Sequence, residues 1–415
     1  MVEKSDDGIL KKLLNSSSNS NLNFNTNNGT DNEGPTTIRN NNSSPPPLTP
    51  IVESDSLHER VGEYKDSERQ FSNSNNNSTN STRDLNISKK AVGVDIGTSR
   101  IVSARIGNDH KELTQSELNA FFMLPYSQIS QDLLAKNKMN YLKIKEHLSV
   151  YGIHGQVFAN MFNGELLRPM KDGLLKSDEP YAVQMIKEIT SLVVGKASEL
   201  GNKLCFSIPA PKTGQESDLI FHEAILKKYF VGAGYNATSI NEGLAVVLSE
   251  LAHENYTGIG VSMGAGMCNI CFSFMSVPVV TFGLPQGGDH IDQSVARVVN
   301  DSITRVKVIK EETLDLSKTP KNNLEQALHI YYDDLISKLV NSISTTFSKT
   351  ENLPKLNKPI PLVLAGGTCI PGGFKVKFDK MLRQVELPIE ISETRLATDP
   401  LRATARGALV CAGTE

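Results

Sequence analysis

Residues 94–99 read Val-Asp-Ile-Gly-Thr-Ser, an apparent strand that ends in a tight turn. Gly97 permits the turn, and the small residues Thr98 and Ser99 leave their backbone N–H groups open to a phosphate. Asp95, at the end of the strand, is suited to hold a Mg²⁺ ion through the waters of that ion. Many hairpins turn through Asp, Gly and Thr, so this stretch becomes informative only together with two later turns.

The second glycine turn lies within residues 258–274. The pattern is again a strand, a turn through Gly264, Ala265 and Gly266, and a strand. Two such hairpins on opposite halves of a protein would clamp the phosphates of a nucleotide from both sides. Taken alone, this segment is explained about equally well by a phosphate-binding hairpin and by a plain β-meander in a sheet.

The third turn ends a strand within residues 362–371, which the sequence predicts to be buried. It runs through Gly366, Gly367 and Thr368, where only backbone would approach a flat base. We therefore expect a bulky residue at Gly366 to occupy the space of such a base. Each turn alone is a weak signal, but three in this order along one chain predict a nucleotide site.

Two helices complete the pattern. The first is predicted to begin at the capping residue Asn241, and the second has Asp399 at the cap and Pro400 at the first helical position. Both carry small residues, namely Gly243 and Ala245 in the first helix and Ala403 and Gly407 in the second. Such residues would suit a hinge where two helices cross, and ordinary tight packing is equally compatible with them.

From Lys90 onward, strands and helices alternate, and a long helix is predicted over Pro180–Leu200. The order of strands followed by helices occurs twice. We therefore expect an α/β protein with two lobes and a cleft between them, residues 90–256 forming the first lobe and 257–394 the second. Residues 395–415 are expected to complete the first lobe.

Residues 1–89 are rich in Asn and Ser and poor in large apolar residues, which predicts a disordered tail. Ile9–Leu14 would place leucines on one face of a short helix beside two lysines. This segment is a candidate anchor to a membrane surface, and a frayed turn without function is the alternative.

The composition excludes several classes of protein. A net charge of −3 predicts no general attraction to nucleic acid. No apolar run is long enough for a membrane span, and the five cysteines of a chain this long indicate a reducing cytoplasm. Cys268 and Cys271 are three residues apart in an apparent strand, so their side chains point to opposite faces and we expect ordinary buried thiols.

The three turns and two helices resemble the five motifs of the actin, heat-shock-chaperone and sugar-kinase superfamily. Within it the chain is most similar to the bacterial actin MreB, in residues 168–174, 287–292 and 305–307. The resemblance implies a two-lobed actin-like ATPase fold of duplicated ribonuclease-H-like domains around a nucleotide cleft. It also implies ATP or ADP with Mg²⁺ as ligands, Lys307 as part of the segment that closes over adenosine, and self-association into filaments.

By position, the resemblance makes Glu242 the residue that orients the attacking water. A solvated residue in the first turn of a helix is the alternative for Glu242. Where the family usually has Asp and Thr in the second turn, this chain has Ser262 and Met267, and Thr304 replaces an acid near Lys307. We therefore expect binding of the nucleotide to persist and ATP hydrolysis to be slow.

The leading expectation is a cytoplasmic, cytoskeletal ATP-binding protein whose filaments are regulated by nucleotide. Three alternatives stay open: a chaperone-like ATPase, a small-molecule kinase, and a membrane-recruiting actin relative such as FtsA. The sequence shows no convincing sugar-recognition cluster, which weighs against the kinase.

Overall fold

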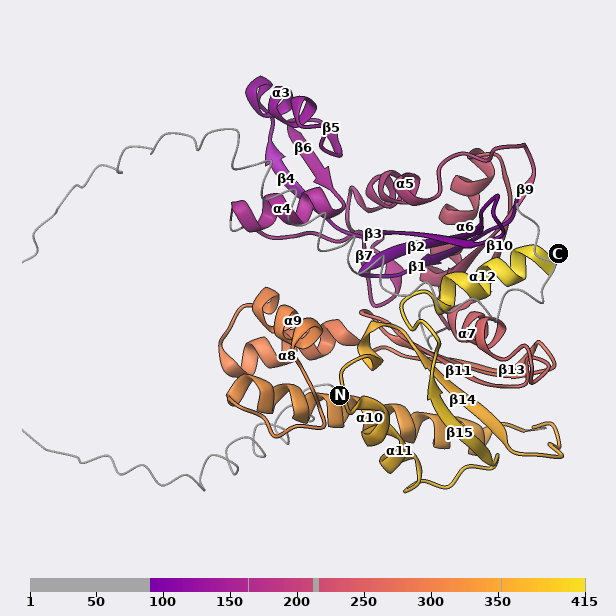
Figure 1. Cartoon of the computed structure of the whole chain (residues 1–415). Helices are drawn as coiled ribbons and strands as arrows, with labels where there is room; N and C mark the ends of the chain where they lie inside the picture. The colour runs from indigo at the N-terminus through magenta and orange to yellow at the C-terminus, as the bar shows by residue number, and fades with distance from the viewer. Residues whose placement is uncertain (1–89, 163, 212–215, 352, 415) are drawn as a thin grey trace, which may run out of the picture. The chain divides into compact units, whose positions relative to one another are not determined.

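The fold was examined in a computed structural model, which describes residues 90–162, 164–211, 216–351 and 353–414. The predicted disordered tail and the candidate anchor Ile9–Leu14 lie outside these residues. The described part is an α/β structure with two five-stranded sheets, a three-stranded sheet and a two-stranded sheet (Figure 1). None of its helices is both long enough and apolar enough to cross a membrane.

The first sheet has the strand order β10-β9-β1-β2-β3. Its strands are β1 (Val92–Ile96), β2 (Arg100–Ile106), β3 (Glu112–Leu118), β9 (Asn202–Ile208) and β10 (Tyr235–Asn241). β1 pairs antiparallel with β2 and parallel with β9, so the turn at Gly97 lies at the carboxyl end of β1. This edge of a sheet is where α/β proteins commonly place their ligands.

The two faces of the first sheet are covered by different helices (Figure 1). On one face, Val94 and Phe206 pack with apolar residues of α5 (Ala182–Val193) and α6 (Glu216–Gly232). On the other face, Val102 and Cys205 pack with Leu409 and its neighbours in α12 (Ala403–Thr414). This alternation follows from the two-residue period of a strand, and it places α12 against β1.

Short elements separate β3 from α5. They are β4 (Phe121–Pro125), α3 (Gln128–Lys136), β5 (Tyr141–Ile144), β6 (His147–Tyr151), α4 (Ile153–Met161), β7 (Met170–Lys171) and β8 (Leu174–Leu175). β4, β5 and β6 form the three-stranded sheet, in the order β4-β6-β5. β7 and β8 form a hairpin whose turn contains Gly173, at a φ of 84°.

The second sheet has the order β13-β12-β11-β14-β15. Its strands are β11 (Gly258–Met263), β12 (Cys268–Phe274), β13 (Val277–Leu284), β14 (Ile360–Ala365) and β15 (Ile391–Leu396). The helices of this half are α8 (Gly288–Val299), α9 (Ile303–Glu312), α10 (Asn323–Lys349) and α11 (Phe374–Leu382). Every residue of β11 and β14 is buried, as expected for central strands covered on both faces.

α7 (Glu242–Glu250) packs against α12 and against β11 and β12. A Cβ atom added to Gly407 of α12 would collide with the carbonyl oxygen of Ala245 in α7. A Cβ atom on Gly243 would lie 2.6 Å from the backbone nitrogen of Cys271 in β12. The predicted close crossing of two helices through small residues is therefore confirmed. Whether the crossing works as a hinge stays a prediction.

Three helices begin or end away from the predicted residues. α5 ends at Val193 instead of Leu200, because Gly195 adopts a φ of 71° and the side chains of Ser103 and Arg105 donate to the Val193 carbonyl. α8 begins at Gly288, whereas the sequence predicts a helix from Asp292. α12 begins at Ala403, because the residues after Asp399 form a turn.

His222 of α6 is fully buried, and this predicts a pH dependence of stability. Burial lowers its pKa to about 4, from the 6.5 of an unburied histidine. At pH values between these two pKa values, His222 binds a proton in the unfolded chain but not in the folded chain. The stability that His222 contributes is therefore complete above pH 6.5 and falls by about 3 kcal/mol as the pH decreases to 4.

Urea unfolding across this pH range should detect the loss. His222→Asn keeps an acceptor for the Leu175 N–H, which donates to His222 Nδ1 over 3.2 Å, and removes the titrating ring. The variant should lose less stability than the unmodified chain between pH 6.5 and 4. Equal losses in the two proteins would show that His222 does not cause the effect.

Candidate functional site

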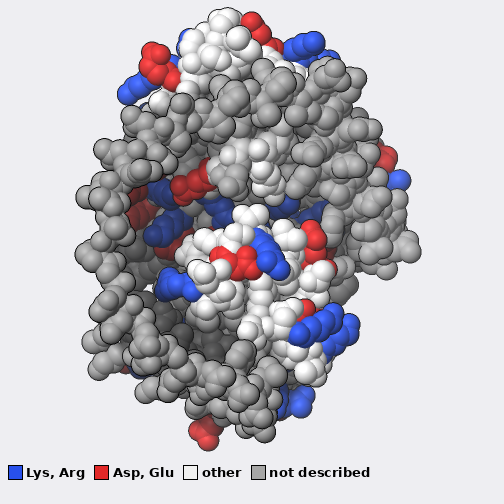
Figure 2. Space-filling model, turned by 90° about the vertical axis from the view of Figure 1, so that its left-hand side faces the viewer, with Lys and Arg blue, Asp and Glu red and all other residues white. Residues whose placement is uncertain are grey.

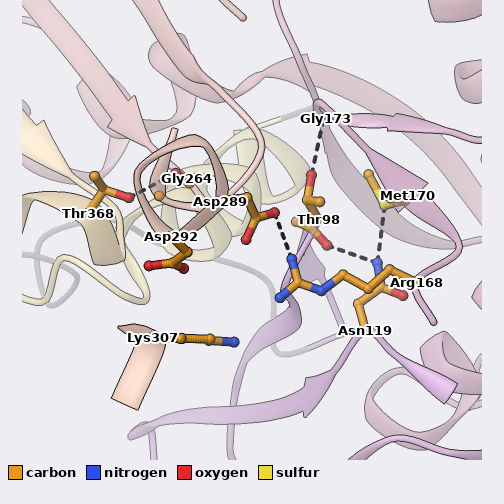
Figure 3. A network of polar contacts seen from close by, with 12 residues as sticks. Thr98, Asn119, Arg168, Met170, Gly173, Gly264, Asp289, Asp292, Lys307 and Thr368 are labelled. Atoms are coloured by element: carbon orange, nitrogen blue, oxygen red, sulfur yellow. Dashed lines mark hydrogen bonds and ion pairs between the residues drawn. The ribbon is translucent and has the colours of Figure 1, made fainter. Parts of the chain in front are cut away.

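The structure brings the first two glycine turns into contact. Thr98 is buried, and its Oγ1 accepts a hydrogen bond from the Gly173 N–H over 3.1 Å (Figure 3). A Cβ atom on Gly266 would lie 2.5 Å from the same Oγ1. Gly97 closes its turn by donating to the Arg100 carbonyl over 3.0 Å, and the Ser99 carbonyl accepts from the N–H of Asn119. The predicted phosphate turns are therefore neighbours, although many residues separate them in sequence.

The third turn joins the second one. Thr368 Oγ1 donates to the Gly264 carbonyl over 2.9 Å (Figure 3). The Gly288 N–H donates to the same carbonyl over 3.1 Å. The Ala265 carbonyl accepts from the Asp289 N–H over 2.8 Å. The second turn is therefore held by the third turn and by the start of α8.

Of the five glycines in these turns, two have space for a side chain and three do not. A Cβ atom on Gly264 would meet only the Met267 carbonyl oxygen, at 3.4 Å, and one on Gly367 would meet only a Leu401 methyl group, at 3.5 Å. Gly366 has a φ of 92°, and its Cβ atom would collide with the backbone of Met263. The predicted reason for the glycine at Gly366 is thus wrong, since a side chain there would disrupt the sheet before it reached a ligand.

Asp95 and Glu242 lie at the carboxyl ends of β1 and β10. Burial raises the pKa of Asp95 to about 6, against the effect of a 2.8 Å hydrogen bond from Ser207 Oγ. Burial, followed by the charge of Asp95, raises the pKa of Glu242 to about 8. The side chain of Glu242 is buried, so the alternative of a solvated first-turn residue is wrong.

This pair of carboxylates fits a divalent cation. Two buried carboxylates that repel one another are relieved by a positive charge between them. Within the described residues, no group of three or more His, Cys, Asp or Glu side chains could hold a metal alone. Water or phosphate oxygens would have to complete the coordination of Mg²⁺, which is common for this ion.

Two polar residues of the second sheet contact Glu242. Ser262 Oγ donates to Glu242 Oε2 over 2.9 Å, and Asn269 Nδ2 donates to the same oxygen over 2.8 Å. The sequence analysis treated Ser262 only as a lost carboxylate and did not identify Asn269. The sequence signal that could have identified Asn269 is its position as a polar residue in the middle of an apolar strand.

Met267 packs between two glycines instead of facing solvent. Its side chain is buried, and a Cβ atom on Gly173 of the β7–β8 turn would lie 2.7 Å from its Sδ. A Cβ atom on Gly283 of β13 would collide with its terminal methyl group. The methionine thus fills a space that the two glycines leave, and it connects the second turn to the β7–β8 hairpin.

Basic residues gather beside the start of α8. Figure 2 shows Lys and Arg side chains in a recess of the face that carries α4, α8 and α9. Arg168 forms an ion pair of 2.7 Å with Asp289, and burial lowers the pKa of the nearby Lys307, mainly against the opposing charge of Glu311 (Figure 3). Lys310 is buried, pairs with Asp292 at 2.7 Å and donates to the Gly288 carbonyl. Lys307 lies on α9, the helix that packs against α8.

Solved structures show how this fold is related to known ones. The double helical filament of MamK superposes with a TM-score of 0.58 at 19% identity, covering 78% of this chain and 98% of that one. MreB5 of Spiroplasma citri bound to AMPPNP gives 0.52 at 12% identity, covering 76% and 94%. MreB5 bound to ADP gives 0.51 at 14% identity with the same coverage. These likenesses confirm the predicted actin-like fold.

Comparison of sequences gives the family. No curated protein matches the chain at a significant level. Residues 90–412 match the Volactin family, and this range covers nearly all of the described structure and most of the chain. With its α/β architecture and the three contacting turns, the chain belongs to the Volactin family and has an actin-like fold.

Proposed function

We propose that this protein binds ATP and ADP with Mg²⁺ at the three glycine turns and that the nucleotide regulates its assembly into filaments. The observation that carries the proposal is the contact of Thr98 in the first turn with Gly266 in the second, together with the bond from Thr368 in the third turn to Gly264. Two structures with this fold contain AMPPNP or ADP. A third structure with this fold is a double helical filament.

Each turn has a role in this proposal. Backbone N–H groups of the first two turns bind phosphate oxygens, and the third turn and Lys307 border the adenosine. Asp95 would hold Mg²⁺ through water, and a bound ion would supply positive charge beside the phosphates. Glu242 orients the attacking water. The residues that bind phosphate and adenosine are Gly97, Thr98, Ser99, Gly264, Ala265, Gly266, Lys307, Gly366, Gly367 and Thr368.

Slow hydrolysis is part of the proposal. Ser262 places a hydroxyl where an additional carboxylate would bind a cation, and the buried Met267 offers no hydroxyl to a phosphate. The backbone N–H groups of the second turn do not depend on either side chain. Binding therefore persists while charge neutralisation during hydrolysis is weaker.

The proposed lobes are residues 90–256 with 395–415, and residues 257–394. Each contains one of the five-stranded sheets, except that β15 crosses the boundary between the second lobe and the last segment. α7 and α12 would lie at the boundary between the lobes, where their crossing is suited to a small rotation.

Binding of nucleotide is tested by adding side chains where the fold has space for them. Gly264→Leu and Gly367→Leu should each weaken ATP binding at least tenfold in calorimetry, because the new side chains would extend into the space of the ligand. Gly232→Leu is the matched control, since a Cβ atom there meets nothing within 4 Å and Gly232 lies at the end of α6. Unchanged affinity in both variants, with unchanged melting temperatures, would contradict the site.

Assembly is tested by electron microscopy of the purified full chain. We expect filaments with ATP and Mg²⁺, and fewer or none when the nucleotide is removed. The Gly264→Leu variant should behave like the chain without nucleotide. Binding of ATP without any filaments would favour a chaperone-like or FtsA-like function over the cytoskeletal one.

A further inference from the structure

One buried amide connects the two halves of the molecule at the site. Asn269 of β12 is fully buried, and its Oδ1 accepts a hydrogen bond from the Ala210 N–H over 2.8 Å. Its Nδ2 donates to Glu242 Oε2 over 2.8 Å. Ala210 follows β9 of the first sheet, whereas β12 belongs to the second sheet. The same side chain thus contacts the other half and the carboxylate of the site.

The strand itself does not need an amide at this position. β12 is otherwise mostly apolar, and burying an amide among apolar groups is costly unless its hydrogen bonds are made. Met267 and Asn269 are two residues apart, and both face the first half, where Met267 contacts Gly173 and Asn269 contacts Ala210. A Cβ atom on Gly283 would lie 3.6 Å from both Asn269 Oδ1 and Ala210 Cβ, so the contact is closely packed.

The bonds to Glu242 fix one oxygen and leave the other available. Ser262 and Asn269 both donate to Oε2. No hydrogen bond to Oε1 is made from the described residues. A carboxylate held through one oxygen keeps a defined direction for the other, as the alignment of a water requires.

We propose that Asn269 is a positioning residue that aligns Glu242 for ATP hydrolysis only while the segment after β9 is docked against β12. The inference rests on the proposed function of this site. In the reaction, a water oxygen bonds to the γ-phosphorus while the bond from phosphorus to the bridging oxygen breaks. ADP leaves with the bridging oxygen, and a proton of the water is released with the inorganic phosphate. Asn269 touches none of these atoms and acts through Glu242.

A purely structural role for Asn269 predicts different results, and two variants separate the possibilities. Asn269→Asp keeps the acceptor for the Ala210 N–H and loses the donor to Glu242. Ala210→Pro removes the N–H and leaves Asn269 and Glu242 unchanged. Ser273→Ala is the matched control, because Ser273 is a fully buried polar residue of the same strand that donates to the Tyr256 carbonyl instead.

The experiment measures kcat for ATP hydrolysis and, by calorimetry, the Kd for ATP, using the full chain with Mg²⁺. We expect both Asn269→Asp and Ala210→Pro to lower kcat at least tenfold with Kd changed less than twofold, and Ser273→Ala to leave both unchanged. If the buried charge of the Asn269→Asp variant prevents folding, the result for Ala210→Pro decides the question, because Ala210→Pro adds no charge.

Three results would overturn the inference. The first is an unchanged kcat in the folded variants, and the second is a loss of kcat matched by an equal loss of binding. The third is an unmodified chain that binds ATP but does not hydrolyse it, which would leave the proposed binding intact. An unmodified chain that binds no ATP would contradict the proposed function itself, and calorimetry shows this before any variant is made.

Discussion

Replacing Gly407 with alanine is expected to destabilise the folded chain by about 3 kcal/mol or more. The added methyl group would collide with the carbonyl oxygen of Ala245, where α12 crosses α7. Backbone atoms on both sides leave no side chain that can move aside, so the helices themselves must separate. Overpacking of a rigid contact typically costs 1–3 kcal/mol, and this contact is closer than usual.

Urea unfolding followed by circular dichroism measures the effect. Gly232→Ala is the control, because Gly232 ends α6 and has open space around it, so this change should be neutral or slightly stabilising. A Gly407→Ala variant as stable as the unmodified chain would mean that the two helices lie further apart than in the structure.

Replacing Glu242 with alanine is expected to lower ATP turnover by about a hundredfold while binding of ATP persists. The carboxylate lies at the start of α7, and removing one preorganised group of such a site typically costs about 3 kcal/mol in the barrier. Binding should persist because the phosphate contacts in the proposal come from backbone N–H groups.

Turnover and calorimetric affinity measured on one preparation check this prediction. Glu199→Ala is the control, since Glu199 is an exposed carboxylate that pairs with Lys90. Equal turnover in the Glu242→Ala variant and the unmodified chain would remove Glu242 from the reaction. A parallel loss of affinity would instead assign it to binding.

The features that could be predicted from the sequence are those with local signals. The three glycine turns, the strands before them and the small residues of the helix crossing depend on neighbouring residues, and the structure places all of them as expected. Thr98 and Gly266 came together because both turns lie at the ends of central strands. The order of the motifs predicted two turns on either side of a phosphate tail, and the direct contact of Thr98 with Gly266 was not predicted.

The remaining features depend on which strands are neighbours in space. The bond from Asn269 to Glu242 joins residues of β12 and α7, and no local pattern gives that distance. The sequence analysis treated Met267 only as the loss of a hydroxyl. The two glycines that it contacts, Gly173 and Gly283, lie in other elements, so its packing could not be predicted locally. The burial of Glu242 was missed for the same reason, since the sheet that covers it follows in sequence.

The position of α12 has a consequence for the order in which the chain can fold during synthesis. β1 is made early, yet the face of its sheet that carries Val102 and Cys205 is covered by α12, which follows every other described strand and helix in the sequence. At bacterial or eukaryotic rates of synthesis, the strands of the first sheet wait on the order of ten seconds or more for that helix. During this time the nascent sheet exposes an apolar face to the ribosome surface and to chaperones. The residues that follow the second sheet therefore complete the half of the protein that was synthesised before that sheet.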